Sequence, residues 1–150
     1  MAKKKPSYIG LLNAIAVGEG RAHRYLDAWA QTTVDEEVAQ TVRFIALREG
    51  EHAMAFAKRM SELGFDVRDG DPNEERAAMR AARSQKLSDQ KKFEHFGLDR
   101  VGAGDDIFTS MFADQSIDPQ TGGLLGRYIA EERDSLRRSA SCYRRLKRRS

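Results

Sequence analysis

The most informative stretch of the chain runs from Val38 to Leu63 and reads VAQTVRFIALREGEHAMAFAKRMSEL. Its apolar residues recur every three or four positions, which is the spacing of one face of an α-helix. Two ionisable residues, Glu49 and His52, stand on that same face, where the pattern predicts buried core. Burying a carboxylate is unfavourable unless another group compensates its charge. This pair is therefore the first candidate for a functional site.

The preceding segment, from Tyr8 to about Gln31, has the same helical periodicity and places Glu19 and His23 on its apolar face. Between the two segments, Thr33-Val34-Asp35-Glu36 has the form of a capping box, with Thr33 as the expected N-cap. A connection this short predicts an antiparallel helical hairpin. In such a hairpin Glu19 comes level with the Glu49/His52 pair.

Carboxylate and imidazole groups that converge inside a helical bundle are typical ligands of a redox-active or Lewis-acidic metal ion. Glu19, Glu49 and His52 are therefore candidate ligands. His23 either joins them or donates a hydrogen bond to a carboxylate, and we favour the second role. Without a metal, the buried glutamates would instead pair with nearby arginines: Arg21, Arg43 or Arg48.

The rest of the chain also predicts helices. Asp71-Pro72 starts a charged helix that runs to about His95, because Asp is a good N-cap and Pro suits the first helical position. A short helix from about Asp105 follows. Asp118-Pro119 then repeats the cap-plus-proline pattern and starts a last helix that extends to about Arg148.

We therefore expect one all-α domain over residues 1–150. The predicted architecture is a four-helix bundle of two antiparallel hairpins. Residues 64–104 form the long crossover between the hairpins and contain an additional helix, and residues 1–6 form a flexible basic tail. No pattern typical of β-strands competes with this interpretation.

Composition narrows the classes of protein. The single cysteine, Cys142, excludes a cysteine-rich zinc site and an internal disulfide framework. No apolar stretch approaches the roughly 20 residues of a membrane-spanning helix, and the N-terminus lacks the apolar region of a secretory signal. A cytoplasmic protein without a membrane partner is the expectation.

Two segments carry a resemblance to a known family. Asn13–Glu19 (NAIAVGE) and Arg48–Ala53 (REGEHA) resemble the ferritin-like superfamily, rubrerythrin branch. The resemblance implies a bundle that holds a carboxylate-bridged pair of irons, with peroxidase, oxidase or iron-storage chemistry. It places Glu19, Glu49 and His52 at the ligand positions of the first half.

The second half of the chain departs from the family pattern. Tyr128–Ser135 (YIAEERDS) resembles the last helix of the family, with Glu132 on the carboxylate position and Glu131 as the alternative. Ser135 stands where a second histidine is expected, and Gly102 where another glutamate is expected. The residues that could substitute are Asp105, Asp106 and Asp134. The site is therefore incomplete for two irons; one or two ions, and manganese or zinc in place of iron, stay open.

The leading hypothesis is a metal-binding protein with non-haem iron chemistry, the reduction of peroxide or dioxygen. Its reducing partner would be an external electron donor, because the chain has no Cys₄ domain. A homodimer is possible through the apolar residues near Phe108 and Phe112. The alternative is a non-catalytic helical interaction module whose basic C-terminus, from Arg133 onward, binds an acidic partner or nucleic acid. The small net charge of +3 and the lack of interleaved aromatic residues disfavour nucleic acid.

Overall fold

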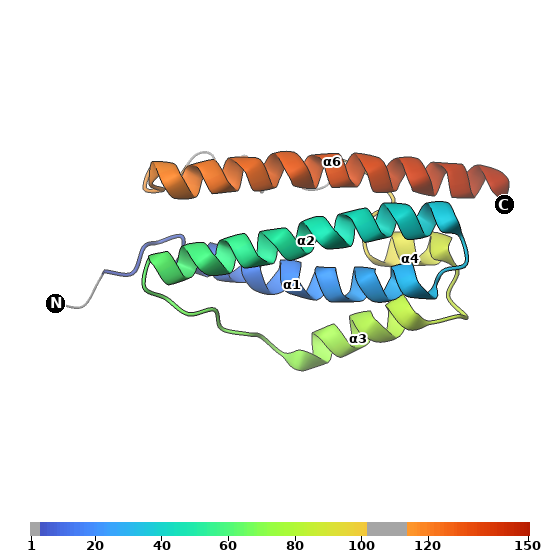
Figure 1. Ribbon diagram of the computed structural model, residues 1–150, viewed down its shortest axis with the longest axis horizontal. Coiled ribbons are helices and arrows are strands. Elements are labelled where there is room, and N and C mark those ends of the chain that lie inside the picture. The colour runs from blue at the N-terminus through green and yellow to red at the C-terminus, as the bar shows by residue number, and fades with distance from the viewer. Residues whose placement is uncertain (1–3, 102–113) are drawn as a thin grey trace.

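The computed structural model describes residues 4–101 and 114–150, and over these residues it is all-helical. The described helices are α1 (Ile9–Thr32), α2 (Glu36–Glu62), α3 (Pro72–Arg83), α4 (Asp89–His95) and α6 (Pro119–Arg149). Helices α1, α2 and α6 run alongside one another, while α3 and α4 belong to the crossover and flank them (Figure 1). The predicted all-α helical bundle is confirmed for these residues. The helix expected from about Asp105 lies outside them.

The α1–α2 hairpin forms as predicted, but a different residue caps its second helix. The Asp35 side chain accepts a hydrogen bond from the Val38 backbone N–H at 3.1 Å and is the N-cap of α2. The prediction that Thr33 is this cap is wrong. Its hydroxyl donates to Asp89 Oδ2 at 2.6 Å and so ties the hairpin connection to α4. At the other end, α2 stops before Gly64, whose φ of 89° is left-handed, as expected of a C-terminal glycine.

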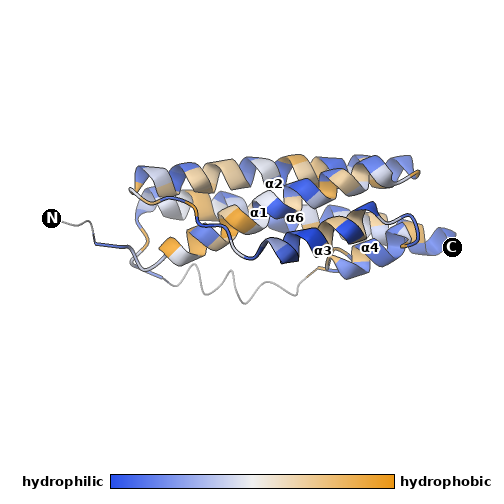
Figure 2. Ribbon diagram, turned by 90° about the horizontal axis from the view of Figure 1, so that it is seen from below, coloured by the Kyte–Doolittle hydropathy of each residue, from blue (hydrophilic) through white to orange (hydrophobic). Residues whose placement is uncertain are grey.

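The crossover contains two short helices where the sequence predicted one. The break lies at residues 84–88, because serine side chains there bind the backbone in place of helical bonds. Ser84 Oγ accepts from the Leu87 N–H at 3.1 Å, and Ser88 Oγ caps α4 by accepting from the Lys91 N–H at 3.2 Å. Most of α3 is coloured as hydrophilic in Figure 2, and Ala82 is its buried residue. None of the described helices has the length and apolar character that crossing a membrane requires.

The apolar core is divided into two clusters by a polar layer. One cluster, around Trp29, Ile45 and Phe93, lies at the end of the bundle with the α1–α2 connection. The other, around Leu12, Phe56 and Leu125, lies at the opposite end. Glu19 on α1, and Glu49 and His52 on α2, fall between these clusters along their helices. The site is therefore held from both sides by close-packed side chains.

Asp118 fixes the start of α6 to the other two long helices. Its carboxylate accepts from the Thr121 N–H at 3.0 Å, from the Tyr8 hydroxyl at 2.5 Å and from Arg59 Nη2 at 3.0 Å. The Tyr8 hydrogen bond, the Thr121 backbone N–H and hydroxyl, and the Arg59 charge hold the pKa of Asp118 well below its usual range.

We expect Asp118→Asn to destabilise the protein by about 1 kcal/mol at pH 7, since charged hydrogen bonds contribute more than neutral ones. A carboxyl whose pKa is lowered by folding stabilises the protein above its unfolded-state pKa of about 4. That stabilisation is lost as the pH falls below this value. Urea unfolding of both proteins between pH 7 and pH 3 measures the difference, which should shrink at acid pH. A difference that stays constant with pH would contradict this role of the Asp118 charge.

Candidate metal centre

Four side chains converge in the polar layer between the two core clusters. Helix α1 contributes Glu19, α2 contributes Glu49 and His52, and α6 contributes Glu132; one potential ligand atom of each lies within 4.8 Å of the others. Glu19, Glu49 and His52 are buried, with 7%, 4% and 5% of their surface exposed. The structure thus brings together the four residues that the sequence analysis placed first.

The two ring nitrogens of His52 face different carboxylates. Nδ1 lies 3.1 Å from Glu19 Oε1 and 3.6 Å from Glu132 Oε1, so it points into the cluster. Nε2 lies 3.2 Å from Glu131 Oε1. A ligating histidine typically donates its other ring N–H to a carboxylate or carbonyl, which fixes its tautomer and orientation. With Glu131 accepting from Nε2, Nδ1 is the nitrogen that can bind a cation.

Burial, together with the closeness of the carboxyl groups to one another, shifts the pKa values in the cluster. Burial is the main cause that raises the pKa of Glu19 and of Glu49, and the neighbouring carboxylates add to it for Glu49. Burial opposes ionisation of Glu132 as well, but the neighbouring side chains of His52, Glu49 and Glu19 outweigh it, and the pKa of Glu132 is lowered. Burial also opposes protonation of His52, yet hydrogen bonds to Glu132 and Glu131 raise its pKa. In the absence of a cation, the raised pKa values of Glu19 and Glu49 therefore favour the protonated form of these two carboxyl groups.

The donor set fits a divalent metal ion. Glu49 Oε2 and Glu132 Oε1 are buried, and neither has a hydrogen-bond partner among the described residues. A buried carboxylate oxygen without a partner is energetically unfavourable. Carboxylate oxygens with an imidazole nitrogen are ligands that iron, manganese and zinc all accept. A cation at this point would satisfy both oxygens.

The arginines that could have neutralised the buried glutamates are engaged elsewhere. Arg21 Nη1 contacts Glu74 at 2.8 Å, and Arg43 is exposed. Arg48 Nη1 lies 2.9 Å from Asp134, and Arg48 Nε lies 3.6 Å from Glu131. None of these arginine contacts involves Glu19 or Glu49, whose neighbours are the other members of the cluster.

His23 does not join the cluster. Its Nδ1 lies 2.6 Å from the Ala46 carbonyl oxygen, so the expectation that it donates to a carboxylate is wrong. The ring lies against Gly50 of α2, where a Cβ atom would approach His23 Nδ1 to 2.8 Å. The absence of a side chain at Gly50 is what allows the imidazole to reach the backbone of the neighbouring helix.

We expect Gly50→Ala and His23→Ala to show a coupling energy of about 1 kcal/mol or more in a double-mutant cycle. In the wild-type background, the added methyl group must displace the imidazole and break its bond to Ala46. In the His23→Ala background, the same substitution should stabilise α2 by about 1 kcal/mol, through helix propensity alone. Thermal or urea unfolding of the four proteins gives the four free energies, and strictly additive effects would refute the contact.

The other candidate residues have separate places. Glu131 lies next to the cluster as the partner of His52 Nε2 and also contacts Arg127 Nε at 3.1 Å. Asp134 contacts Arg48 and Arg138 and therefore does not act as a substitute ligand here. The remaining positions of the family pattern, together with the apolar pair proposed for dimerisation, lie outside the described residues: Gly102, Asp105, Asp106, Phe108 and Phe112.

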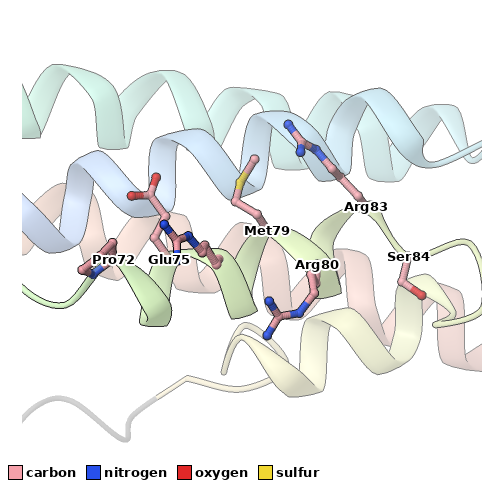
Figure 3. A pocket seen from close by; sticks show the side chains of 7 residues that line it. Pro72, Glu75, Met79, Arg80, Arg83 and Ser84 are labelled. Atoms are coloured by element: carbon pink, nitrogen blue, oxygen red, sulfur yellow. The ribbon is translucent and has the colours of Figure 1, made fainter.

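Two hollows in the surface differ in their relation to the cluster. A cavity of about 80 Å³ between α2 and α6 is lined by His52, Tyr128 and Glu131, among others. A groove of about 760 Å³ follows α3 instead, with Met79, Arg80 and Arg83 along it (Figure 3). Among the described residues that line this groove, Glu75 is the one carboxylate, and it pairs with Arg24. Of these two hollows, the small cavity is the one that borders the candidate centre, at the His52 ring and Glu131.

The basic end of α6 is partly neutralised by the α1–α2 connection and α2. Arg145 contacts Glu37, and Arg149 contacts Glu37 at 3.2 Å and Asp35 at 3.8 Å. Arg138 pairs with Asp134 on its own helix. These charges therefore help to attach α6 to the hairpin, and they are less available to an external acidic partner than the sequence suggested.

The contact between Arg48 of α2 and Ser135 of α6, beside the centre, was not predicted from the sequence. Arg48 Nη1 lies 3.1 Å from Ser135 Oγ. One feature of the sequence indicated it. Arg48 directly precedes Glu49 on α2, just as Glu131 directly precedes Glu132 on α6, so the two residues hold equivalent positions on facing helices.

No protein-family model, curated protein or solved structure matches this chain.

Proposed function

We propose that this protein is a ferritin-like metal protein that reduces peroxide or dioxygen at a non-haem iron. The observation that carries the proposal is the convergence of four oxygen and nitrogen ligands within 4.8 Å of one another in a buried layer of the bundle. Three carboxylates and one imidazole offset the charge of a divalent cation, which an apolar interior otherwise excludes.

Each residue has a distinct role in the proposal. Glu19, Glu49 and Glu132 bind through carboxylate oxygens, and His52 binds through Nδ1. Glu131 holds the Nε2 proton of His52 and so orients the ring. When bound, the metal ion supplies Lewis-acid or one-electron redox chemistry.

The size of the adjacent cavity supports a small reactant. The cavity of about 80 Å³ beside His52 suits a molecule of the size of water, peroxide or dioxygen. Electrons must come from an external donor, because the one cysteine, Cys142, is buried and cannot form a sulfur cluster alone.

Elemental analysis of protein purified without chelator tests metal binding, with Glu49→Ala beside the wild type. We expect a transition metal in the wild type and little in the variant; only trace metal in both would reject the proposal. Stopped-flow absorbance of the iron(II)-loaded protein then tests the chemistry. Oxidation by peroxide or dioxygen should be faster than that of free iron(II) under the same conditions, and equal rates would leave a metal protein without this activity.

A further inference from the structure

The contacts on the two sides of the centre are related by position. Helix α2 carries Glu49 with His52 three residues later, and α6 carries Glu132 with Ser135 three residues later. The residue before each glutamate reaches across to the other helix. Glu131 Oε1 contacts His52 Nε2 at 3.2 Å, and Arg48 Nη1 contacts Ser135 Oγ at 3.1 Å.

The two sides differ in charge and in ligand. On the first side, a carboxylate orients an imidazole, which presents a nitrogen ligand. On the second side, a guanidinium contacts a hydroxyl, so there is a cation and no nitrogen ligand. The second side therefore differs from the first at both positions. Arg48 stands where the carboxylate would be, and Ser135 stands where the imidazole would be.

The Arg48 guanidinium is firmly held. Besides Ser135, its Nη1 donates to the Glu131 carbonyl at 3.1 Å and to Asp134 Oδ2 at 2.9 Å, and 17% of its side-chain surface is exposed. Ser135 is buried. Like charges that lie close together in a partly buried site repel each other. A second divalent cation on this side would meet that repulsion and would lack a nitrogen ligand.

We propose that the centre binds a single divalent cation on the His52 side, and that Arg48 and Ser135, which stand in place of a carboxylate and an imidazole, prevent a second ion from binding on the other side. The inference rests on the proposed function, since it presupposes that the cluster binds a metal. It makes the centre mononuclear, with a guanidinium where the carboxylate partner of a second imidazole would be.

Cobalt(II) titration followed by native mass spectrometry tests the count of ions. The wild type should bind one Co²⁺ tightly. The double variant Arg48→Glu/Ser135→His recreates the carboxylate–imidazole pair of the first side and should bind two. Arg43→Glu makes the same charge change as Arg48→Glu at an exposed position of α2, and it should keep a count of one.

Each result is decisive. Two tight ions in the wild type would overturn the inference and leave the proposed function standing, whereas no ion would reject the proposed function itself. A double variant that keeps its helical circular dichroism but still binds one ion would overturn the role of Arg48. Should the double variant unfold, Arg48→Met replaces it: a second, weaker Co²⁺ binding event absent from the wild type supports the role, and its absence overturns it.

Discussion

Replacing Glu49 with glutamine should weaken the binding of Mn²⁺, Zn²⁺ or Fe²⁺ by about 100-fold or more. Even the outer partners of metal ligands contribute about 10–100-fold to affinity, and Glu49 is a buried member of the cluster itself, with an oxygen that has no partner among the described residues. Glutamine keeps the shape of the side chain, but its single amide oxygen carries no negative charge. Isothermal titration calorimetry, with chelator competition for tight binding, measures the change.

The matched control is Glu51→Gln, two residues along the same helix. It removes the same formal charge, but Glu51 is exposed and does not belong to the cluster. We expect its metal affinity to stay within a few-fold of the wild type. The metal-free Glu49→Gln protein should have a urea unfolding midpoint at least as high as that of the wild type. Burial already favours the neutral form of Glu49 by raising its pKa, so the neutral glutamine costs no stability. Equal affinities for the two variants would show that Glu49 is not a ligand.

Trp29→Ala should destabilise the protein by about 3–5 kcal/mol, the usual effect of truncating a fully buried aromatic side chain. Trp29 has no exposed surface, and its ring packs against Phe93 at 4.8 Å and Phe96 at 5.9 Å between centroids. Its indole N–H also donates to Asp89 Oδ1 at 2.8 Å. The substitution would leave a cavity and detach α4 from α1.

Urea unfolding monitored by circular dichroism measures this loss. Trp29→Phe fills part of the cavity and should be destabilised by less than the alanine variant. Phe44→Ala is the contrasting control, since Phe44 is 40% exposed on α2. A loss below about 1 kcal/mol for Trp29→Ala would mean that α4 does not depend on this contact.

The features of the fold that could be predicted are those encoded within one helix or its ends. The apolar stripe of α2, the stop at Gly64 and the start at Asp118 follow from local spacing and from residues with strong positional preferences. The break between α3 and α4 was missed because Ser84 and Ser88 are compatible with a helix until their side chains bind the backbone. Which of Thr33 and Asp35 caps α2 depended on Asp89, a distant residue that takes the Thr33 hydroxyl.

The same distinction applies to the centre. The convergence of Glu19, Glu49, His52 and Glu132 could be predicted because each is an ionisable residue within the repeating apolar pattern of a helix. The position of His23 was wrong because it depends on Gly50, the small residue of the facing helix that admits its ring. The contact of Arg48 with Ser135 joins helices far apart in sequence, and no pattern within either helix requires it.

The division of the core has a consequence for how the protein unfolds. Each apolar cluster is close-packed, but the layer that joins them consists of carboxyl groups and an imidazole. Polar side chains transmit less packing energy than a close-packed apolar core, so without a cation we expect each end of the bundle to open separately, as cooperative units of other proteins do. A bound ion ligates α1, α2 and α6 at once and makes the two ends open together. Amide hydrogen exchange should therefore show two levels of protection in the metal-free protein and one in the metal-bound protein.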